Sequence, residues 1–410
     1  SSCFLLSAII SGSSSDMMST PISGLKQRAI ERITAIEDQL WQISCTLHEN
    51  PETGFQEFKA YDLLTTFLTE LGYTLEPKLG GLNTAFRACL GSEHDIKIAL
   101  LAEYDALPVL GHACGHNLIA ASAVGAAAGL SAVIEHLSGQ VQIIGTPAEE
   151  GGGGKILLAR AGVFSDIHAA MMFHPASKNM TLRGSLASSR LKLEFFGKAS
   201  HAALAPEEGI NALDALLLTF NNINALRGRL TARDRIAGII THGGEAVNIV
   251  PHYTTAQFSI RSQTSHRRDE LVEAVVDCAQ AGAQAIGCTL KHEVVPGYAD
   301  IIPNRVIARL VENNLSDLGR TVVPPDPFER MGSTDMGNIS HLLPSIHFYL
   351  AIAPENIAGH TDEFRAYSIS PAGKIGMLDA AKALAMTTID LLSNPSLLVE
   401  ARQEFNSHND

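Results

Sequence analysis

The sequence predicts a mostly parallel α/β domain that is interrupted by a smaller, ferredoxin-like domain of βαββαβ order. Short apolar segments alternate with helical ones in both outer parts of the 410-residue chain, which is typical of a parallel sheet. The middle part has the strand and helix order of a split βαβ unit. We expect a tail over residues 1–24 that is disordered or not native, a large domain in two parts, 25–187 and 300–400, and an inserted domain over 188–299.

The first part of the large domain begins with helical periodicity. Apolar residues recur at helical spacing over 26–71 and are interrupted by Pro51 and Gly54, which predicts two helices around a turn. The apolar runs DIKIALLAEYDALP (95–108), VQIIGTPAEE (141–150) and HAAMMFHPA (168–176) follow. Runs without alternation are typical of buried parallel strands. Each ends in ionisable residues, and ligands of such sheets bind at the carboxyl ends of the strands.

An alanine-rich helix is predicted over 118–137, after the first of these strands, and Asn117 is a candidate for its N-cap. The remaining predicted elements are strand 190–198, helix 209–226, strands 235–243 and 254–262, helix 266–286, strand 288–296, helix 306–318, strand 345–353 and helix 370–392.

Composition narrows the classes of function. The net charge is -13 and no cluster of Lys and Arg is present, which argues against a nucleic-acid partner. No apolar run approaches the ~18–20 residues of a membrane helix, so no membrane partner is expected. The six cysteines are scattered and the first residues lack the basic region of a signal peptide. These features predict a reduced, cytoplasmic protein.

The stretch GHACGHN places His112, Cys114 and His116 at every second position. Residues two apart cannot share one face of a helix, whereas an extended loop can direct them the same way. Taken alone, each is most often a buried thiol or a satisfied histidine. Here Cys114 and His116 lie between a strand end and a helix start, where helix polarity favours a thiolate.

Three other strand ends carry candidate ligands. PAEEGGGG contains the adjacent carboxylates Glu149 and Glu150, FHPA contains His174, and the loop AGHTDEF contains His360. Individually, these are ordinarily a solvated acidic edge and structural histidines. Together with GHACGHN they form a set that suits two divalent ions per subunit, Zn²⁺ first, with Mn²⁺, Co²⁺ or Ni²⁺ as alternatives. A spare carboxylate beside a metal-binding one is what metal-assisted hydrolysis requires.

The motifs GHACGH, PAEEGG, FHP, GKASHA, NIVP and GHTDEF, in this order over 26–392, resemble the dinuclear-metal aminoacylase and carboxypeptidase family. The similarity is to its amidohydrolase branch, which includes p-aminobenzoyl-glutamate hydrolases and β-alanyl-lysine dipeptidases. The resemblance implies that Cys114 bridges two ions, that Glu150 and His360 hold one, and that His116 and His174 hold the other.

The resemblance also implies roles for residues that hold no metal. Glu149 becomes the general base and Asp105 orients a metal ligand. In the inserted domain, which becomes a lid and dimerisation domain, His201 acts in the active site of a partner subunit in a homodimer. Asn248 and Arg261 grip the tetrahedral oxygen or the substrate carboxylate. Without the resemblance, these three would be a sheet-edge histidine, a turn asparagine and a surface arginine.

Two positions depart from most of this branch, because Glu103 and Asn117 stand where Asp is usual. Both variants resemble the p-aminobenzoyl-glutamate and β-alanyl-lysine subgroup, as does GSTDMGNIS (332–340). In that stretch Asp335 either receives a substrate cation or caps a helix. The resemblance thus implies hydrolysis of an amide bond in a small dipeptide or an N-acyl or N-aroyl amino acid.

Two other functions remain open from the residues alone. Cys114 beside His112 or His116 could be the nucleophile of a metal-independent thiol hydrolase. A non-catalytic protein that binds small amides or metal would be expected to lack Glu149 or one of the ligands, and neither is missing.

Overall fold

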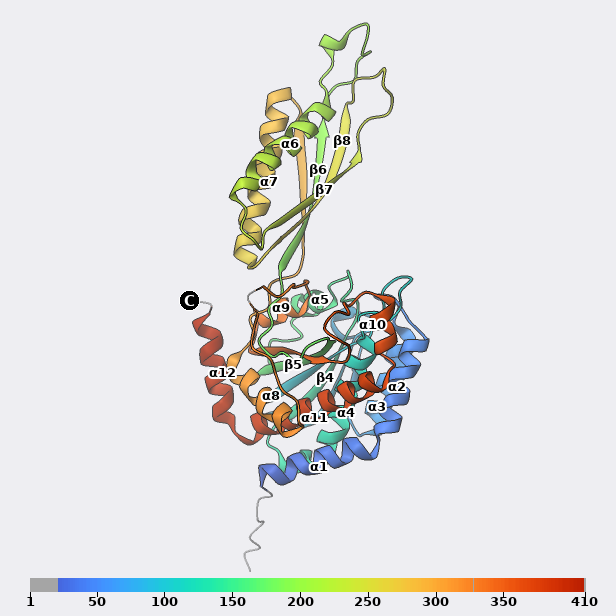
Figure 1. Cartoon of the computed structure of the whole chain (residues 1–410), viewed down its shortest axis with the longest axis vertical. Coiled ribbons are helices and arrows are strands. Elements are labelled where there is room, and N and C mark those ends of the chain that lie inside the picture. Colours follow the sequence, from blue (N-terminus) through green and yellow to red (C-terminus); the bar gives the residue numbers. More distant parts are fainter. Residues whose placement is uncertain (1–20, 327, 409–410) are drawn as a thin grey trace, which may run out of the picture.

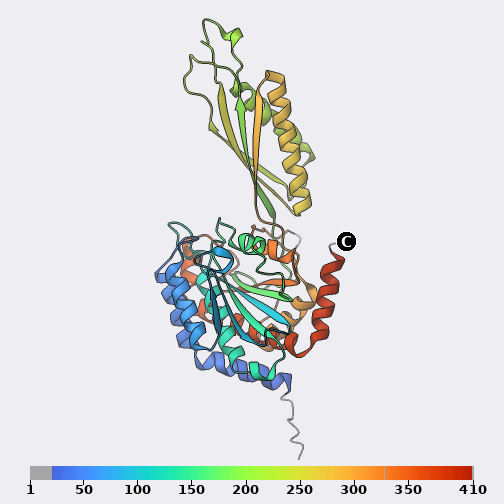
Figure 2. The same cartoon turned by 180° about the vertical axis from the view of Figure 1, so that it is seen from behind.

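The structure is a computed structural model that describes residues 21–326 and 328–408. Their strands form two separate sheets, one in a large rounded domain and one in a small domain that extends away from it (Figures 1 and 2). The predicted fold class, a mostly parallel α/β domain with an inserted βαββαβ domain, is confirmed. Among the described residues, no helix is both long and apolar enough to cross a membrane.

The large domain contains the elements at both ends of the chain. Its helices are α1 (Ile22–Ala35), α2 (Glu37–Glu49), α3 (Phe58–Glu70), α4 (His116–Ser131), α5 (Gly154–Arg160), α8 (Arg305–Asp317), α9 (Met336–Ser340), α10 (Asp362–Tyr367), α11 (Pro371–Ser393) and α12 (Pro395–Ser407). Its strands are β1 (Thr74–Pro77), β2 (Phe86–Gly91), β3 (Lys97–Glu103), β4 (Gln140–Thr146), β5 (Ala169–Ala176) and β10 (Ser345–Ala351).

The large sheet has the strand order β1-β2-β4-β3-β5-β10. β4, β3, β5 and β10 run parallel, whereas β1 and β2 pair antiparallel at one edge. The parallel strands are almost wholly buried, as their unbroken apolar sequences predict. Their carboxyl ends share one edge, where Glu103 pairs in register with Thr146.

Helix α4 lies in the centre of the large domain and contacts β3, β4, β5, α1, α2 and α11. Every residue from His116 to Leu130 is buried, so small side chains are needed on all sides. A Cβ at Gly129 would lie 2.8 Å from the Ile33 side chain of α1. The helix begins two residues earlier than predicted, with Gly115 as its N-cap. Asn117 is therefore not the cap, and its amide donates to Ser44 Oγ at 2.9 Å.

The helices near the two ends differ from the prediction. The segment expected to form one helix before Pro51 is two, since Ile36 (φ -117°, ψ 18°) separates α1 from α2. Helix α12 was not predicted, although Pro395 at its first turn is a typical helix start. Of the predicted tail, residues 22–24 belong to α1, and residues 1–20 lie outside the described residues.

The small domain is an antiparallel sheet with two helices. Its elements are β6 (Ala187–Phe196), α6 (Ala212–Leu226), β7 (Arg235–His242), β8 (Tyr253–Ser262), α7 (Ser265–Ile286) and β9 (Thr289–Pro296), and the strand order is β7-β8-β6-β9. Helices α6 and α7 contact each other and the sheet. Residues such as Leu193, Phe195 and Val275 form a hydrophobic core that is separate from that of the large domain.

Candidate metal centre

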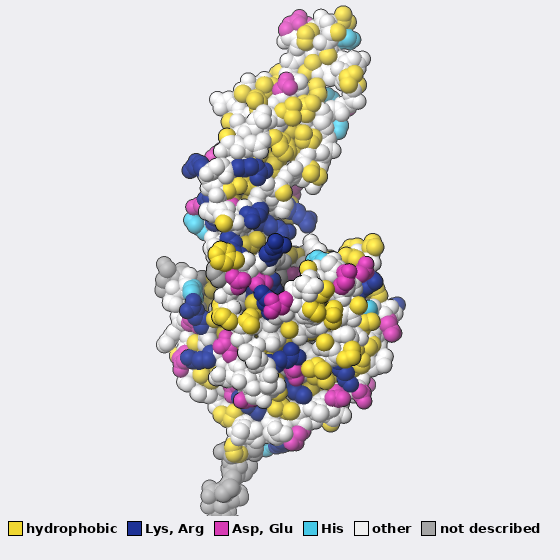
Figure 3. Space-filling view, viewed as in Figure 1, with side chains coloured by type: hydrophobic (Ala, Val, Ile, Leu, Met, Phe, Trp, Pro, Cys, Tyr) yellow, Lys and Arg dark blue, Asp and Glu magenta, His cyan; other side chains and the backbone are white. Residues whose placement is uncertain are grey.

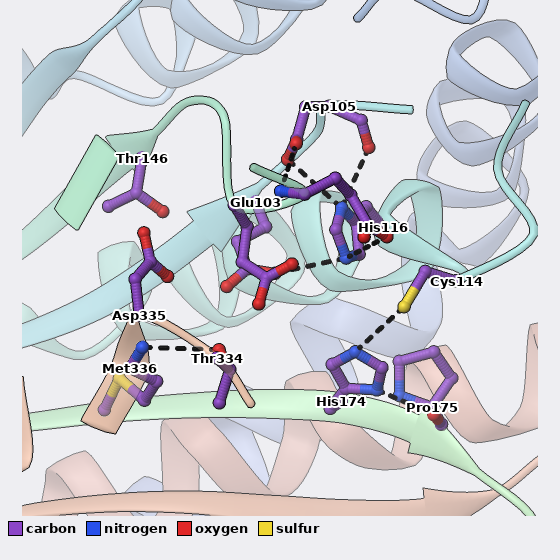
Figure 4. Close-up of polar contacts among 12 residues, drawn as sticks. Glu103, Asp105, Cys114, His116, Thr146, His174, Pro175, Thr334, Asp335 and Met336 are labelled. Atoms are coloured by element: carbon purple, nitrogen blue, oxygen red, sulfur yellow. Dashed lines mark hydrogen bonds and ion pairs between the residues drawn. The ribbon is translucent and has the colours of Figure 1, made fainter. Parts of the chain in front are cut away.

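Four segments that are distant in sequence bring candidate ligands together at the carboxyl edge of the large sheet. Cys114 comes from the loop before α4, and His116 is the first residue of that helix. Figure 4 shows both pointing toward His174 of β5. The ligand atoms of these three residues lie within 4.8 Å of one another, and so do those of Cys114, Glu150 and His360. The two groups share the Cys114 sulfur, as two ions with a bridging ligand require.

Asp105 fixes the orientation of two candidate ligands. Its main-chain oxygen lies 2.8 Å from His116 Nδ1 and its Oδ1 lies 3.2 Å from the same nitrogen. Its Oδ2 accepts a hydrogen bond of 3.0 Å from the Glu150 amide. Burial would raise the pKa of Asp105, but the hydrogen bond with His116 outweighs it and the pKa is lowered. A buried carboxylate that directs a ligating imidazole is typical of metal sites.

The polar atoms left over by these contacts fit a metal. His116 Nε2 and Glu150 Oε1 are buried, 3.8 Å apart, and have no hydrogen-bond partner among the described residues. Burial would raise the pKa of the Cys114 thiol, but the His174 and His116 imidazoles lower it well below its usual value. The site therefore offers a thiolate, a carboxylate and imidazole nitrogens, which are the donors that Zn²⁺ and similar ions bind.

The backbone is unusual at two positions of the centre. Ala148, next to the paired glutamates, has φ 58°, and His360 has φ 65°. Non-glycine residues rarely adopt this left-handed region, and such strain is concentrated at functional sites. The His360 amide donates to Ala113 O at 2.9 Å, which ties its loop to the Cys114 loop. The imidazole of His360 lies 3.4 Å from Glu150 Oε1.

Glu149 lies beside the candidate ligands with its side chain in a negatively charged environment. Its carboxylate, that of Glu103 and His116 Nε2 fall within 4.8 Å of one another. Burial, and then the negative charges of Glu103 and Asp335, raise the pKa of Glu149 well above its usual value. A carboxylate with a raised pKa is suited to accept and return a proton near neutral pH.

Asp335 does not occupy the position predicted for it. The residue is fully buried, and its carboxylate accepts hydrogen bonds from Lys155 Nζ (2.8 Å) and the Lys155 amide (3.0 Å). The same ammonium group contacts Glu103 Oε1. The prediction that it receives a substrate cation is therefore wrong, because the carboxylate is buried and already neutralised. The alternative role, a helix cap, is found at α5, whose first-turn Lys155 amide it accepts from, and not at α9. Removing either partner of this cluster would leave buried charge unpaired.

A cavity of about 560 Å³ lies between the metal centre and the base of the small domain. Its walls include Cys114, Glu149 and His360 from the large domain and Arg261 from β8. Arg261 Nη1 lies 3.5 Å from Ser333 Oγ across the domain junction. The volume is typical of a pocket for a small molecule.

His201 and Asn248 do not line this pocket. Both lie in loops beyond one end of the β6–β8 strand pair, the end at which Phe196 pairs with Tyr253. Arg261 pairs with Ser188 at the opposite end of the same two strands. Ten residues of strand span about 30 Å, so the two side chains are far from their own metal centre. The Ala203 and Leu204 amides donate to His201 Nδ1, which leaves Nε2 as a hydrogen-bond donor.

Sequence reasoning missed several residues of the site. Lys155 follows a glycine run and would ordinarily be a surface lysine, yet it is fully buried. The Tyr298 hydroxyl donates to the main-chain oxygen of Glu149. His347 and Tyr349 belong to a strand that reads as apolar core, but both line the pocket, as does Arg183. Only the pairing of β10 with β5 brings His347 and Tyr349 to the site.

Comparison with known proteins agrees with this geometry. Residues 183–286 match the family model described as the peptidase dimerisation domain of the M20 family. The chain is 38% identical to an Xaa-Arg dipeptidase of Mus musculus over 93% of this chain and 92% of that protein. It is also 28% identical to one of the chains of the p-aminobenzoyl-glutamate hydrolase of Escherichia coli K12, over 91% of this chain and 92% of that one.

Solved structures show the same fold. A dinuclear metal binding peptidase of the M20 family from Bacillus subtilis superposes with a TM-score of 0.70 at 20% identity, covering 88% of this chain and 99% of that one. An aminobenzoyl-glutamate utilization protein from Klebsiella pneumoniae gives 0.67 at 18% identity, over 88% and 97%. Because its similarity to curated relatives extends over nearly its whole length, the chain belongs to the M20 family of metal-dependent peptidases and amidohydrolases.

Proposed function

We propose that this enzyme hydrolyses the amide bond of a small dipeptide or N-acyl amino acid at the centre formed by Cys114, His116, Glu150, His174 and His360. The observation that carries the proposal is the shared sulfur: among the described residues, Cys114 belongs to two of the three candidate ligand groups, whereas Glu149 groups with Glu103 and His116 and not with Cys114. In this arrangement the metal ligands and a separate proton acceptor occupy one wall of the pocket.

The chain's own groups divide the chemistry as follows. A pair of divalent ions would acidify a water and polarise the scissile carbonyl. The Glu149 carboxylate takes the proton of the attacking water and passes it to the departing amide nitrogen. Asp105 keeps His116 Nε2 directed at the centre. The Tyr298 hydroxyl holds the main chain at Glu149.

The donor set favours Zn²⁺, because a thiolate with imidazoles and a carboxylate is a common zinc environment; Mn²⁺, Co²⁺ and Ni²⁺ are the alternatives. A thiolate ligand must stay reduced, and the described cysteines are all free, which supports a cytoplasmic location.

The pocket favours a substrate with a free carboxylate. Apart from Glu149 and Glu150, the charged residues that line it in the described chain are Arg183, Arg190 and Arg261. The relatives include an Xaa-Arg dipeptidase, and a dipeptide would fit a pocket of about 560 Å³. These three arginines also support a second candidate, a p-aminobenzoyl-glutamate type of substrate, which carries two carboxylates.

A substrate panel separates these candidates. Enzyme loaded with Zn²⁺ or Mn²⁺ is assayed against Xaa-Arg dipeptides, β-alanyl-lysine, p-aminobenzoyl-glutamate, hippurate and acetylated amino acids. We expect kcat/KM to be highest for one of the first three. Hydrolysis of none of the five classes would contradict the proposed function.

Metal removal distinguishes this proposal from a thiol hydrolase with Cys114 as nucleophile. Chelation is expected to abolish hydrolysis, because the proposed reaction needs metal ions to activate the water. Add-back of Zn²⁺ or Mn²⁺ should restore it. The measurement is activity against bound metal, determined by mass spectrometry. Activity that survives complete removal of metal would support the thiol mechanism, because a cysteine nucleophile needs none.

A further inference from the structure

The wall of the pocket beneath the metal centre is built from β5 and β10. Tyr349 of β10 pairs in register with the candidate ligand His174 of β5, so both side chains lie on the same face of the sheet. His347 precedes Tyr349 by two residues and therefore shares that face. The His347 and His174 rings are 5.5 Å apart, and those of Tyr349 and His174 are 5.6 Å apart.

Two buried nitrogens in this wall have no partner among the described residues. His347 is 1% exposed; its Nδ1 lies 3.1 Å from the Tyr349 hydroxyl, and its Nε2 is unpaired. The guanidinium of Arg183 lies over the Tyr349 ring, 4.7 Å from its centroid, and Arg183 Nε is also buried and unpaired. Buried polar groups are ordinarily hydrogen-bonded, so two buried nitrogens without a partner, on residues that line a pocket, point to a ligand.

A third group that lines the pocket has a hydrogen-bond donor to spare. Ser185 Oγ accepts a hydrogen bond of 3.0 Å from the Ile301 amide, so its hydroxyl proton remains available, and Ser185 lines the pocket. No acidic residue other than Glu149 and Glu150 lines the pocket in the described chain. Basic side chains also gather at the end of the small domain that faces the large domain (Figure 3). Arg183 already pairs with Glu329 through Nη2 at 3.4 Å, so what it offers an anion here is its unpaired Nε.

We propose that His347, together with Arg183 and Ser185, binds the substrate carboxylate that lies one carbon from the scissile nitrogen. The Tyr349 hydroxyl lies 3.1 Å from His347 Nδ1. In this proposal the hydroxyl donates to Nδ1, which places the ring proton on Nε2 as a donor toward the pocket. The His347 ring contacts the ring of the candidate ligand His174, so a carboxylate bound by His347 would lie next to the metal centre. His347 is thus a specificity residue and Tyr349 a positioning residue. The inference rests on the proposed function and assigns residues to the carboxylate that the proposed substrates share.

The test compares a dipeptide with its C-terminal amide. Wild type should favour the acid, and His347→Leu should raise KM for the acid about 10- to 100-fold with little change for the amide, as expected for one hydrogen bond to a charged group. His347→Gln, which keeps a donor, should recover part of the preference, and Tyr349→Phe should lose part of it. Metal content and unfolding midpoint are measured for each variant.

Failure of this inference can be told from failure of the proposed function by product binding. Calorimetry with arginine and argininamide reports on the subsite without turnover. The subsite is wrong if wild type hydrolyses dipeptides but His347→Leu leaves the acid-to-amide preference unchanged. If the leucine variant misfolds, Tyr349→Phe and His347→Gln give the same test. If wild type hydrolyses no dipeptide or N-acyl amino acid, the proposed function fails, and equal binding of the two products would overturn the subsite as well.

Discussion

Replacing Glu149 with glutamine is expected to leave both metal ions bound and to lower kcat by about 10²- to 10⁴-fold, the usual worth of a general base. Glutamine has nearly the same shape but cannot take a proton from water. The ligand groups that contain Cys114 do not include Glu149, so metal should be retained. The measurements are metal content per subunit and single-turnover rates on the best substrate.

The adjacent glutamate provides the matched control. Glu150→Gln should lose or weaken one ion, because Glu150 belongs to the group with Cys114 and His360. Folding should not suffer in the Glu149 variant, since burial and the charges of Glu103 and Asp335 raise the pKa of Glu149, and a neutral amide relieves that repulsion. A Glu149→Gln enzyme with wild-type turnover would refute the assigned base.

A dimer assembled from two different variants is expected to regain activity that each variant lacks. If His201 acts in the partner's active site, a purified heterodimer of Glu149→Gln and His201→Ala chains contains one site with an intact Glu149 and an intact partner His201. Such a dimer should show about half of the wild-type activity, because one of two symmetry-related sites is complete. The distance of the His201 loop from its own pocket, a full strand length, is the physical reason.

The reverse pairing is the control for this experiment. A heterodimer of the wild-type chain with a chain that carries both substitutions should be nearly inactive if His201 acts between subunits, and about half active if it acts within its own chain. Sedimentation must show dimers in all samples. A fully active monomer, or half activity only in this second pairing, would contradict a role for His201 across the interface.

The sequence predicted the fold class and the cluster of ligands because both depend on local pattern. Unbroken apolar strands that end in Glu149, Glu150 and His174 follow from the strand periodicity and the edge rule for parallel sheets. The positions of Cys114 and His360 in loops required the motif resemblance in addition. Their convergence is present in the structure.

The residues that were missed depend on contacts distant in sequence. Lys155 looks like a surface residue until Asp335, 180 positions later, is folded against it. That contact also removes Asp335 as a receiver of a substrate cation. His347 lies in an apolar strand, where a lone histidine reads as core, and only the neighbouring strand shows that its face is the pocket wall. No local periodicity carries such information.

Anomalous diffraction from crystals of the metal-loaded enzyme tests the central claim most directly. We expect two peaks per subunit, with the Cys114 sulfur about 2.3 Å from each, as for a zinc thiolate, one ion also bound by His116 and His174, and the other by Glu150 and His360. A single peak, or two peaks with the Cys114 sulfur bound to neither, would contradict the account.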